Sequence, residues 1–137
     1  MKRVLIAGAV CSLLAACQAP LPTLQPTSMR HTVFFDWDRA NITPQAAATI
    51  RTAADQARSG NAVRLDVVGH TDTSGEPGYN MGLSQRRANA VRDELVRDGI
   101  SPQAIVVSGR GESQPLITTA DGVREPQNRR AEITISP

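Results

Sequence analysis

Two helical patterns, each between short β-branched runs, constrain the fold of this 137-residue chain more than any other feature. In the first pattern, Thr43 provides an N-cap, Pro44 occupies the first helical position, and apolar residues recur at helical spacing until Gly60. The apolar residues are Ala46, Ala47, Ile50, Ala53, Ala54 and Ala57. Because alanine is small, this face predicts a helix packed closely against a sheet.

The second helical pattern begins near residue 83. Ser84 is predicted as its N-cap, with Leu83 and Ala88 placed for a hydrophobic staple, and Gly99 ends it. Its apolar face comprises Ala88, Val91 and Leu95.

Four short runs have strand character, at residues 32–35, 63–69, 105–107 and 131–135. Their alternation with the helices predicts an α/β (α+β) sandwich of order βαβαββ, with a four-stranded sheet packed by two main helices. We expect a mixed sheet with one antiparallel strand. Periodicity leaves the strand order open.

Residues 1–16 combine a basic start, an apolar stretch and small residues, which predicts a secretion signal. The segment Leu14–Cys17 resembles the lipobox of bacterial lipoproteins, and this implies acylation of Cys17 after removal of the leader. Several acyl chains would anchor the protein stably in a bilayer. The alternative is an ordinary signal peptide cleaved near Ala16, with Cys17 a free thiol. Gln18 follows Cys17, and it is not the aspartate that the resemblance to lipoproteins would link with retention in the inner membrane, so the resemblance implies outer-membrane sorting.

Residues 17–30 contain Pro20, Pro22 and Pro26 without hydrophobic periodicity, which predicts an extended tether after Cys17. Residues 31–137 then form one folded domain. Without the leader, the basic residues fall from 15 to 13 and equal the 13 acidic residues. This balance disfavours nucleic acid as a partner, because nucleic-acid binders carry a clustered basic surplus.

Polar motifs gather between residues 69 and 88. They are Gly69–Gly75, Tyr79–Asn80, Leu83–Ser84 and Arg86–Ala88, with FDWD at 35–38, GxGExxP at 109–115 and NRRAEI at 128–133. This set resembles the OmpA-like peptidoglycan-binding domain of small outer-membrane lipoproteins, over about residues 31–137.

Asp72 follows the end of a predicted strand, and Arg87 falls at the third position of the second predicted helix. Free backbone N–H groups and the helix dipole favour an anion there, and an aspartate opposite favours an ammonium. The two charges could therefore hold a zwitterionic amino-acid head, either of a free amino acid or of a peptidoglycan stem. An internal salt bridge is the structural alternative.

The resemblance selects peptidoglycan. It implies that Asp72 takes the amine, and Arg87 the carboxylate, of diaminopimelate in an uncrosslinked stem. It further implies a binding cup completed by Asp38, Thr71, Ser74, Asn80 and Arg129, the last delivered by the loop at 121–128. At Asp38 some relatives carry a neutral amide, so the second carboxylate here alters the charge balance. Arg130 is expected to be a solvated charge on the opposite side.

His70 could also have a catalytic or metal-binding role. It could form a hydrolase triad with Asp72 and Ser74 or Ser84, or a metal site with Asp66 and Asp72. No second His, Cys or Glu stands at ligand spacing, and no GxSxG elbow is present. A structural histidine bonded to the loop backbone is predicted instead, with no metal, cofactor or catalytic residues.

The resulting functional hypothesis is noncovalent peptidoglycan binding by a lipid-anchored protein that tethers the outer membrane to the cell wall and faces the periplasm. The alternative is an envelope adaptor, like the peptidoglycan-associated lipoproteins, that mainly binds periplasmic protein partners.

Overall fold

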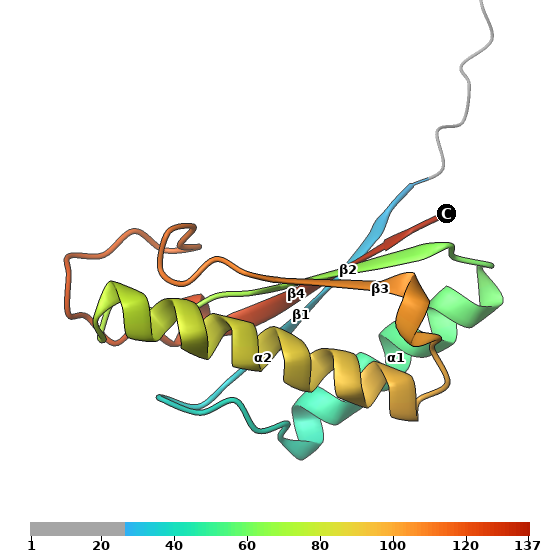
Figure 1. Ribbon diagram of the computed structural model, residues 1–137, viewed down its shortest axis with the longest axis horizontal. Helices are drawn as coiled ribbons and strands as arrows, with labels where there is room; N and C mark the ends of the chain where they lie inside the picture. Colours follow the sequence, from blue (N-terminus) through green and yellow to red (C-terminus); the bar gives the residue numbers. More distant parts are fainter. Residues whose placement is uncertain (1–26) are drawn as a thin grey trace, which may run out of the picture.

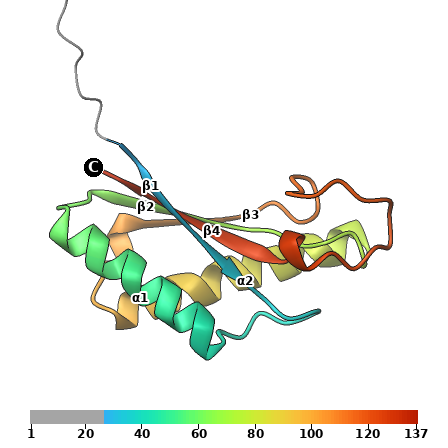
Figure 2. The same ribbon diagram turned by 180° about the vertical axis from the view of Figure 1, so that it is seen from behind.

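The computed structural model describes residues 27–137, which form a sheet with two helices on one face (Figures 1 and 2). The strands and helices are β1 (Met29–Phe34), α1 (Pro44–Ser59), β2 (Arg64–Gly69), α2 (Pro77–Arg97), β3 (Ile105–Gly109) and β4 (Arg130–Ser136), with short 3-10 helices η1 (Pro102–Ala104) and η2 (Pro126–Asn128). The predicted leader, Cys17 and most of the tether lie outside the described residues. Within residues 27–137, neither helix has the length and apolar character needed to cross a membrane.

The sheet has four strands in the order β1-β4-β2-β3. Strand β4 runs antiparallel to both β1 and β2, whereas β2 and β3 are parallel. This confirms the predicted βαβαββ order and the mixed sheet with a single antiparallel strand. The last strand of the chain therefore lies between the first and the second.

Two helix predictions had different outcomes. Helix α1 begins as predicted, because the Thr43 hydroxyl accepts a hydrogen bond from the Ala46 amide at 3.1 Å and Pro44 takes the first position. Helix α2 begins at Pro77, with Glu76 as its N-cap, so the prediction of Ser84 as N-cap is wrong. Ser84 is a buried residue inside α2, and Arg87 lies in the middle of the helix instead of its first turn.

Strand β1 also differs from its predicted bounds. Met29 and Arg30, which were assigned to the tether, pair with Ile135 and Thr134 of β4. The predicted boundary at residue 31 missed them because Met29 and Arg30 follow a proline-containing stretch and lack β-branched side chains. Phe35 lies just beyond β1 and is buried.

The core fills the space between the sheet and the two helices. Val67 of β2 and Ile133 of β4 are fully buried, and Ile50 of α1 and Val91 of α2 pack from the other side. The alanines of α1 allow the helix to lie close to the strands. The opposite sheet face carries more exposed side chains, such as Arg64 on β2.

The core generates a first prediction. Ile50→Asp should lower the free energy of unfolding by about 4 kcal/mol or more, because it buries an unpaired carboxylate and removes apolar packing. Thr52→Asp, at an exposed position of the same helix, serves as the control and should change stability by less than about 1 kcal/mol. Urea unfolding followed by circular dichroism measures both. Equal midpoints for the two variants would contradict this description of the core.

Candidate functional site

The predicted site residues gather at the end of the sheet where β1 and β2 finish. The loop after β1 supplies Trp37 and Asp38, the loop after β2 supplies Asp72 and Ser74, and the first turn of α2 supplies Asn80. Together with neighbouring residues they line a hollow of about 160 Å³. Its lining comprises Trp37, Asp38, Asp72, Ser74, Gly75, Tyr79, Asn80, Leu83 and Arg87.

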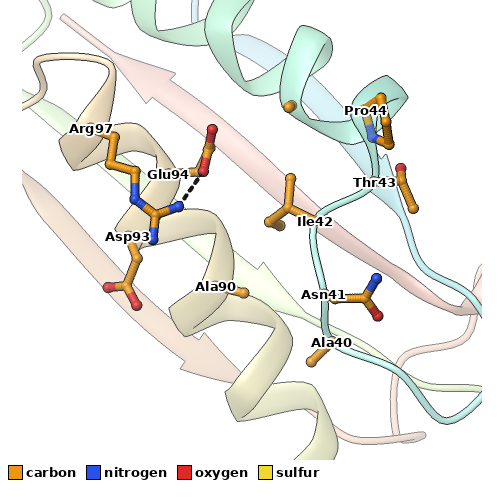
Figure 3. Close-up of a pocket in the computed structure, with 10 residues that line it drawn as sticks. Ala40, Asn41, Ile42, Thr43, Pro44, Ala90, Asp93, Glu94 and Arg97 are labelled. Atoms are coloured by element: carbon orange, nitrogen blue, oxygen red, sulfur yellow. Dashed lines mark hydrogen bonds and ion pairs between the residues drawn. The ribbon is translucent and has the colours of Figure 1, made fainter.

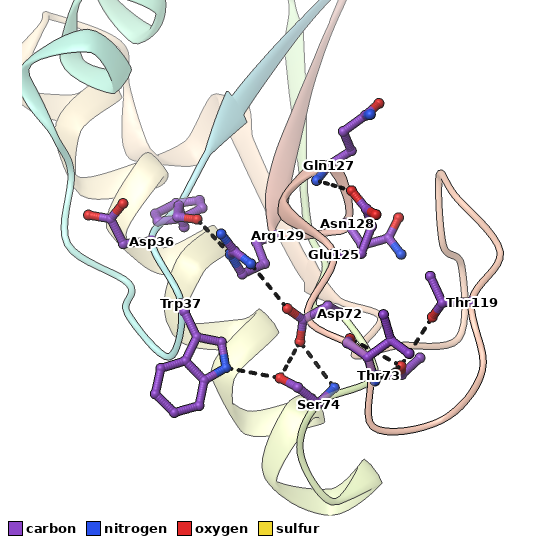
Figure 4. A network of polar contacts seen from close by, with 12 residues as sticks. Asp36, Trp37, Asp72, Thr73, Ser74, Thr119, Glu125, Gln127, Asn128 and Arg129 are labelled. Carbon is purple, nitrogen blue, oxygen red and sulfur yellow. Dashed lines mark hydrogen bonds and ion pairs between the residues drawn. The ribbon is translucent and has the colours of Figure 1, made fainter.

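Asp72 is buried, and its carboxylate is held from two sides (Figure 4). One oxygen accepts hydrogen bonds from the Ser74 amide at 3.1 Å and the Ser74 hydroxyl at 2.6 Å. The other oxygen lies 3.4 Å from an Nη of Arg129. These contacts fix the direction of the carboxylate before any ligand arrives.

Arg87 is fully buried, and its guanidinium donates to three backbone carbonyls. They belong to Arg39 at 2.9 Å, His70 at 2.9 Å and Asp36 at 3.2 Å. Burial lowers the pKa of Arg87 to about 10, an effect that the nearby Asp72 charge opposes. Arg87 therefore remains cationic at neutral pH, and two of its five N–H groups have no hydrogen-bond partner among residues 27–137.

The electrostatic origin of the site differs from the prediction. Because Arg87 lies far from the helix N-terminus, the positive charge comes from its own side chain and not from free backbone N–H groups. The alternative of a salt bridge between Asp72 and Arg87 is wrong as well, since the ion pair of Asp72 among the described residues is with Arg129.

Asn80 and Thr71 form hydrogen bonds with the loops around the hollow. The buried Asn80 amide nitrogen lies within hydrogen-bonding distance of the Asp72 carbonyl at 3.2 Å and the Glu112 carboxylate at 2.6 Å. Thr71 does not line the hollow, although it was predicted in the cup. Its backbone amide donates to the Gly111 carbonyl at 2.9 Å.

Arg129 also lies outside the lining of this hollow, against the back of Asp72. Its Nε donates to the Phe35 carbonyl at 3.1 Å, so it joins the ends of β1 and β2. The prediction that Arg130 is a solvated charge is wrong. Arg130 is buried, because the chain between β3 and β4 folds over it and the Gln114 carbonyl accepts its hydrogen bond at 3.2 Å.

Two aromatic residues of the site were missed by the sequence analysis. Trp37 donates from Nε1 to the Ser74 hydroxyl at 3.0 Å, and Arg124 stacks over its ring at 3.5 Å from the centroid. Tyr79 donates its hydroxyl to Asp38 at 2.5 Å. They are the single Trp and single Tyr of the chain. Their positions inside the FDWD and YN motifs could have indicated that they belong to the site.

His70 is buried beside Glu132, whose carboxylate lies 3.6 Å from its Nε2. The ring makes no hydrogen bond to the described residues, so the predicted ring contact with the loop backbone is wrong. Burial lowers its pKa to about 4, and Arg130 and Arg110 act in the same direction, whereas Glu132 opposes them. No cluster of three or more metal-ligating side chains occurs in residues 27–137.

A larger hollow of about 460 Å³ lies between α2 and the segment leading into α1 (Figure 3). Ile42, Ala90 and Arg97 are among its lining residues, and none of the predicted site residues reaches it. Its size therefore does not make it the candidate site.

Residues 34–129 match the OmpA family. The chain belongs to this family. It is 46% identical over 117 residues to an outer membrane protein of Gluconacetobacter diazotrophicus, and the match covers 80% of this chain and 31% of that relative. The chain spans 31%, 35% and 61% of the length of three curated relatives that it matches.

Solved structures agree with this OmpA-family fold. The peptidoglycan-associated lipoprotein from Burkholderia pseudomallei superposes with a TM-score of 0.71 at 29% identity, covering 77% of this chain and 90% of that one. The cell wall anchor of the T6SS from Pseudomonas aeruginosa gives a TM-score of 0.65 at 28% identity, covering 80% and 81%.

The site of this OmpA-family domain depends on close packing between α2 and the ends of β2 and β3. The Ser84 hydroxyl accepts a hydrogen bond from the Gly111 amide at 2.8 Å. A Cβ at Gly69 would lie 1.9 Å from the Ser84 carbonyl oxygen. Only glycine at this position allows the helix backbone to come this near.

Gly69→Ala should therefore displace α2 and lower the free energy of unfolding by about 2 kcal/mol or more. Gly78→Ala is the matched control, because a Cβ there meets no atom within 4 Å. The control should be neutral or stabilising by about 0.5–1 kcal/mol, since alanine favours a helix. Chemical denaturation compares the variants, and a Gly69→Ala domain as stable as the control would refute this packing.

The lowered pKa of the buried His70 predicts that the domain loses stability in acid. Between pH 6.5 and about 4, the unfolded chain protonates this imidazole while the folded chain keeps it neutral. Stability should thus fall as the pH decreases through this window, by at most about 3 kcal/mol from this group. His70→Gln should show a shallower decline in urea midpoints between pH 7 and pH 4. Parallel declines in both proteins would exclude His70 as the cause.

Proposed function

We propose that this chain binds peptidoglycan without altering it chemically, through the hollow between Asp72 and Arg87. Asp72 accepts from the ammonium, and Arg87 donates to the carboxylate, of diaminopimelate at an uncrosslinked stem end. Asp38, Ser74 and Asn80 complete the lining. Thr71 and Arg129 contribute from outside it, by fixing the loop and the Asp72 carboxylate.

One observation carries this proposal: both charges line the same small hollow, yet each is stabilised by other partners. Serine and arginine contacts hold Asp72, and carbonyl dipoles hold Arg87. Because the two groups do not neutralise each other, each keeps bonding capacity for a zwitterionic ligand.

The size of the hollow supports a small polar ligand. The hollow, at about 160 Å³, is smaller than common ligand pockets of about 300–1,000 Å³, so it has room for the end of an amino-acid side chain and not for a larger ligand. A linear stem end could enter it while the glycan remains outside. The names of the related peptidoglycan-associated lipoprotein and cell wall anchor agree with a wall ligand.

The position of the site supports a role in tethering. Strand β1 begins at Met29, beside Ile135, and ends at Phe34 at the opposite end of the sheet (Figure 1). The loop that carries Trp37 and Asp38 follows Phe34. An acylated Cys17 in the outer membrane would therefore hold the domain by the end remote from the site. We infer a lipid-anchored outer-membrane protein that faces the periplasm and uses no cofactor.

Asp72→Asn tests the assignment with little change of shape. It should weaken binding to a diaminopimelate-containing tripeptide at least about tenfold and reduce co-sedimentation with purified sacculi, because a charge-assisted hydrogen bond is lost. Asp93→Asn, an exposed carboxylate change on α2, should bind as the wild type does. Calorimetry and sedimentation measure both variants. Wild-type affinity in Asp72→Asn would count against the site, and muropeptide release would count against the noncatalytic role.

A further inference from the structure

The lining of the hollow includes a second carboxylate, the exposed side chain of Asp38, which has one hydrogen-bond partner. Asp38 adopts a left-handed backbone conformation, with φ of 54°, and one of its oxygens accepts the Tyr79 hydroxyl hydrogen bond at 2.5 Å. Its other oxygen has no hydrogen-bond partner among residues 27–137. Since a positive φ is costly for a residue other than glycine, the Tyr79 contact and the loop must maintain this conformation.

We propose that Asp38, oriented by Tyr79, is a second acceptor for the ligand ammonium, so that the site requires the ammonium more strictly than the carboxylate. This inference rests on the proposed function and extends its ligand class. The site would accept stem peptides whose side-chain carboxylate is amidated as well as those in which it is free. Tyr79 is a positioning residue, because it acts through Asp38.

Hydrogen-bonding capacity favours the ammonium. Asp38 offers one unoccupied oxygen, and the Asp72 oxygen that Ser74 does not contact has only the 3.4 Å contact with Arg129. Arg87, in contrast, already donates to three carbonyls. A carboxamide oxygen can still accept from the two remaining N–H groups of Arg87. An acetylated amine is neutral and has a single N–H donor in place of the three of an ammonium, so it cannot bind both carboxylates.

The net charge of the lining also favours the ligand ammonium. The lining carries Asp38 and Asp72 against Arg87, a surplus of one negative charge. A zwitterionic ligand leaves this surplus in place, whereas an amidated ligand end carries one positive charge and neutralises it.

Charges outside the lining do not reverse this balance. Arg129 beside Asp72 and Glu112 beside Asn80 have opposite signs. Arg86 and Arg124 lie over the exposed rings of Tyr79 and Trp37 and do not line the hollow. Asp38 is exposed as well, but it belongs to the lining and is therefore closer to a ligand in the hollow.

Three tripeptides test the proposal by calorimetry with the folded domain: one with a free diaminopimelate side-chain terminus, one with its terminal carboxylate amidated, and one with its terminal amine acetylated. The amidated peptide should bind within about fivefold of the free one, because a neutral acceptor replaces a charged one at Arg87. The acetylated peptide should bind at least about a hundredfold more weakly.

Three variants distinguish a role of Tyr79 in positioning Asp38 from a general effect on the stability of the domain. Asp38→Asn should weaken binding of the amidated peptide by about tenfold, more than that of the free peptide, and Tyr79→Phe should change the ratio in the same direction. Asp55→Asn, an exposed change on α1, should leave the ratio unaltered. A general loss of stability would reduce both affinities without changing their ratio.

Amidation as damaging as acetylation, or a ratio unchanged in Asp38→Asn, would overturn this inference while leaving diaminopimelate binding intact. If the wild type binds none of the three peptides, the proposed function fails and the inference fails with it.

Discussion

The buried guanidinium of Arg87 organises this end of the domain. It joins α2 to two loops that come from different strands, because it donates to the carbonyls of Asp36 and Arg39 after β1 and of His70 after β2. A buried charge without partners would be strongly destabilising, so these carbonyls must stay where the guanidinium can reach them. The same bonds thereby fix the loops that carry Asp38 and Asp72.

Backbone packing supplies the rigidity that this contact needs. Gly69 brings the end of β2 against the backbone of α2 at Ser84, and Ser84 binds the amide of Gly111 beyond β3. The chain that follows folds back over Arg130 and returns Arg129 to the rear of Asp72. Three connecting segments thus meet α2 at one place. A hollow formed in this way is preorganised, so ligand binding requires little ordering of the protein.

The arrangement keeps opposite charges close without allowing them to cancel. Asp72 is bound by Ser74 and Arg129, whereas Arg87 is bound by carbonyls. Burial lowers the pKa of Arg87 only to about 10, so its charge persists at neutral pH. Such a site suits recognition of a dipolar group. Asp38, which accepts a hydrogen bond from Tyr79, adds a second carboxylate to the lining.

Local sequence determined the elements of this protein, and tertiary structure decided the surroundings of its charges. Thr43 and Pro44 predicted the start of α1 because capping is a local interaction, and the motifs around Asp72 indicated a candidate site because spacing along the chain is local as well. The start of α2 at Pro77 was missed because the polar first turns of the helix, which line the hollow, lack an apolar period. The burial of Arg130 and the place of β4 between β1 and β2 depend on segments distant in the sequence. Only the folded chain brings those segments together, since burial and strand pairing are long-range properties that periodicity does not encode.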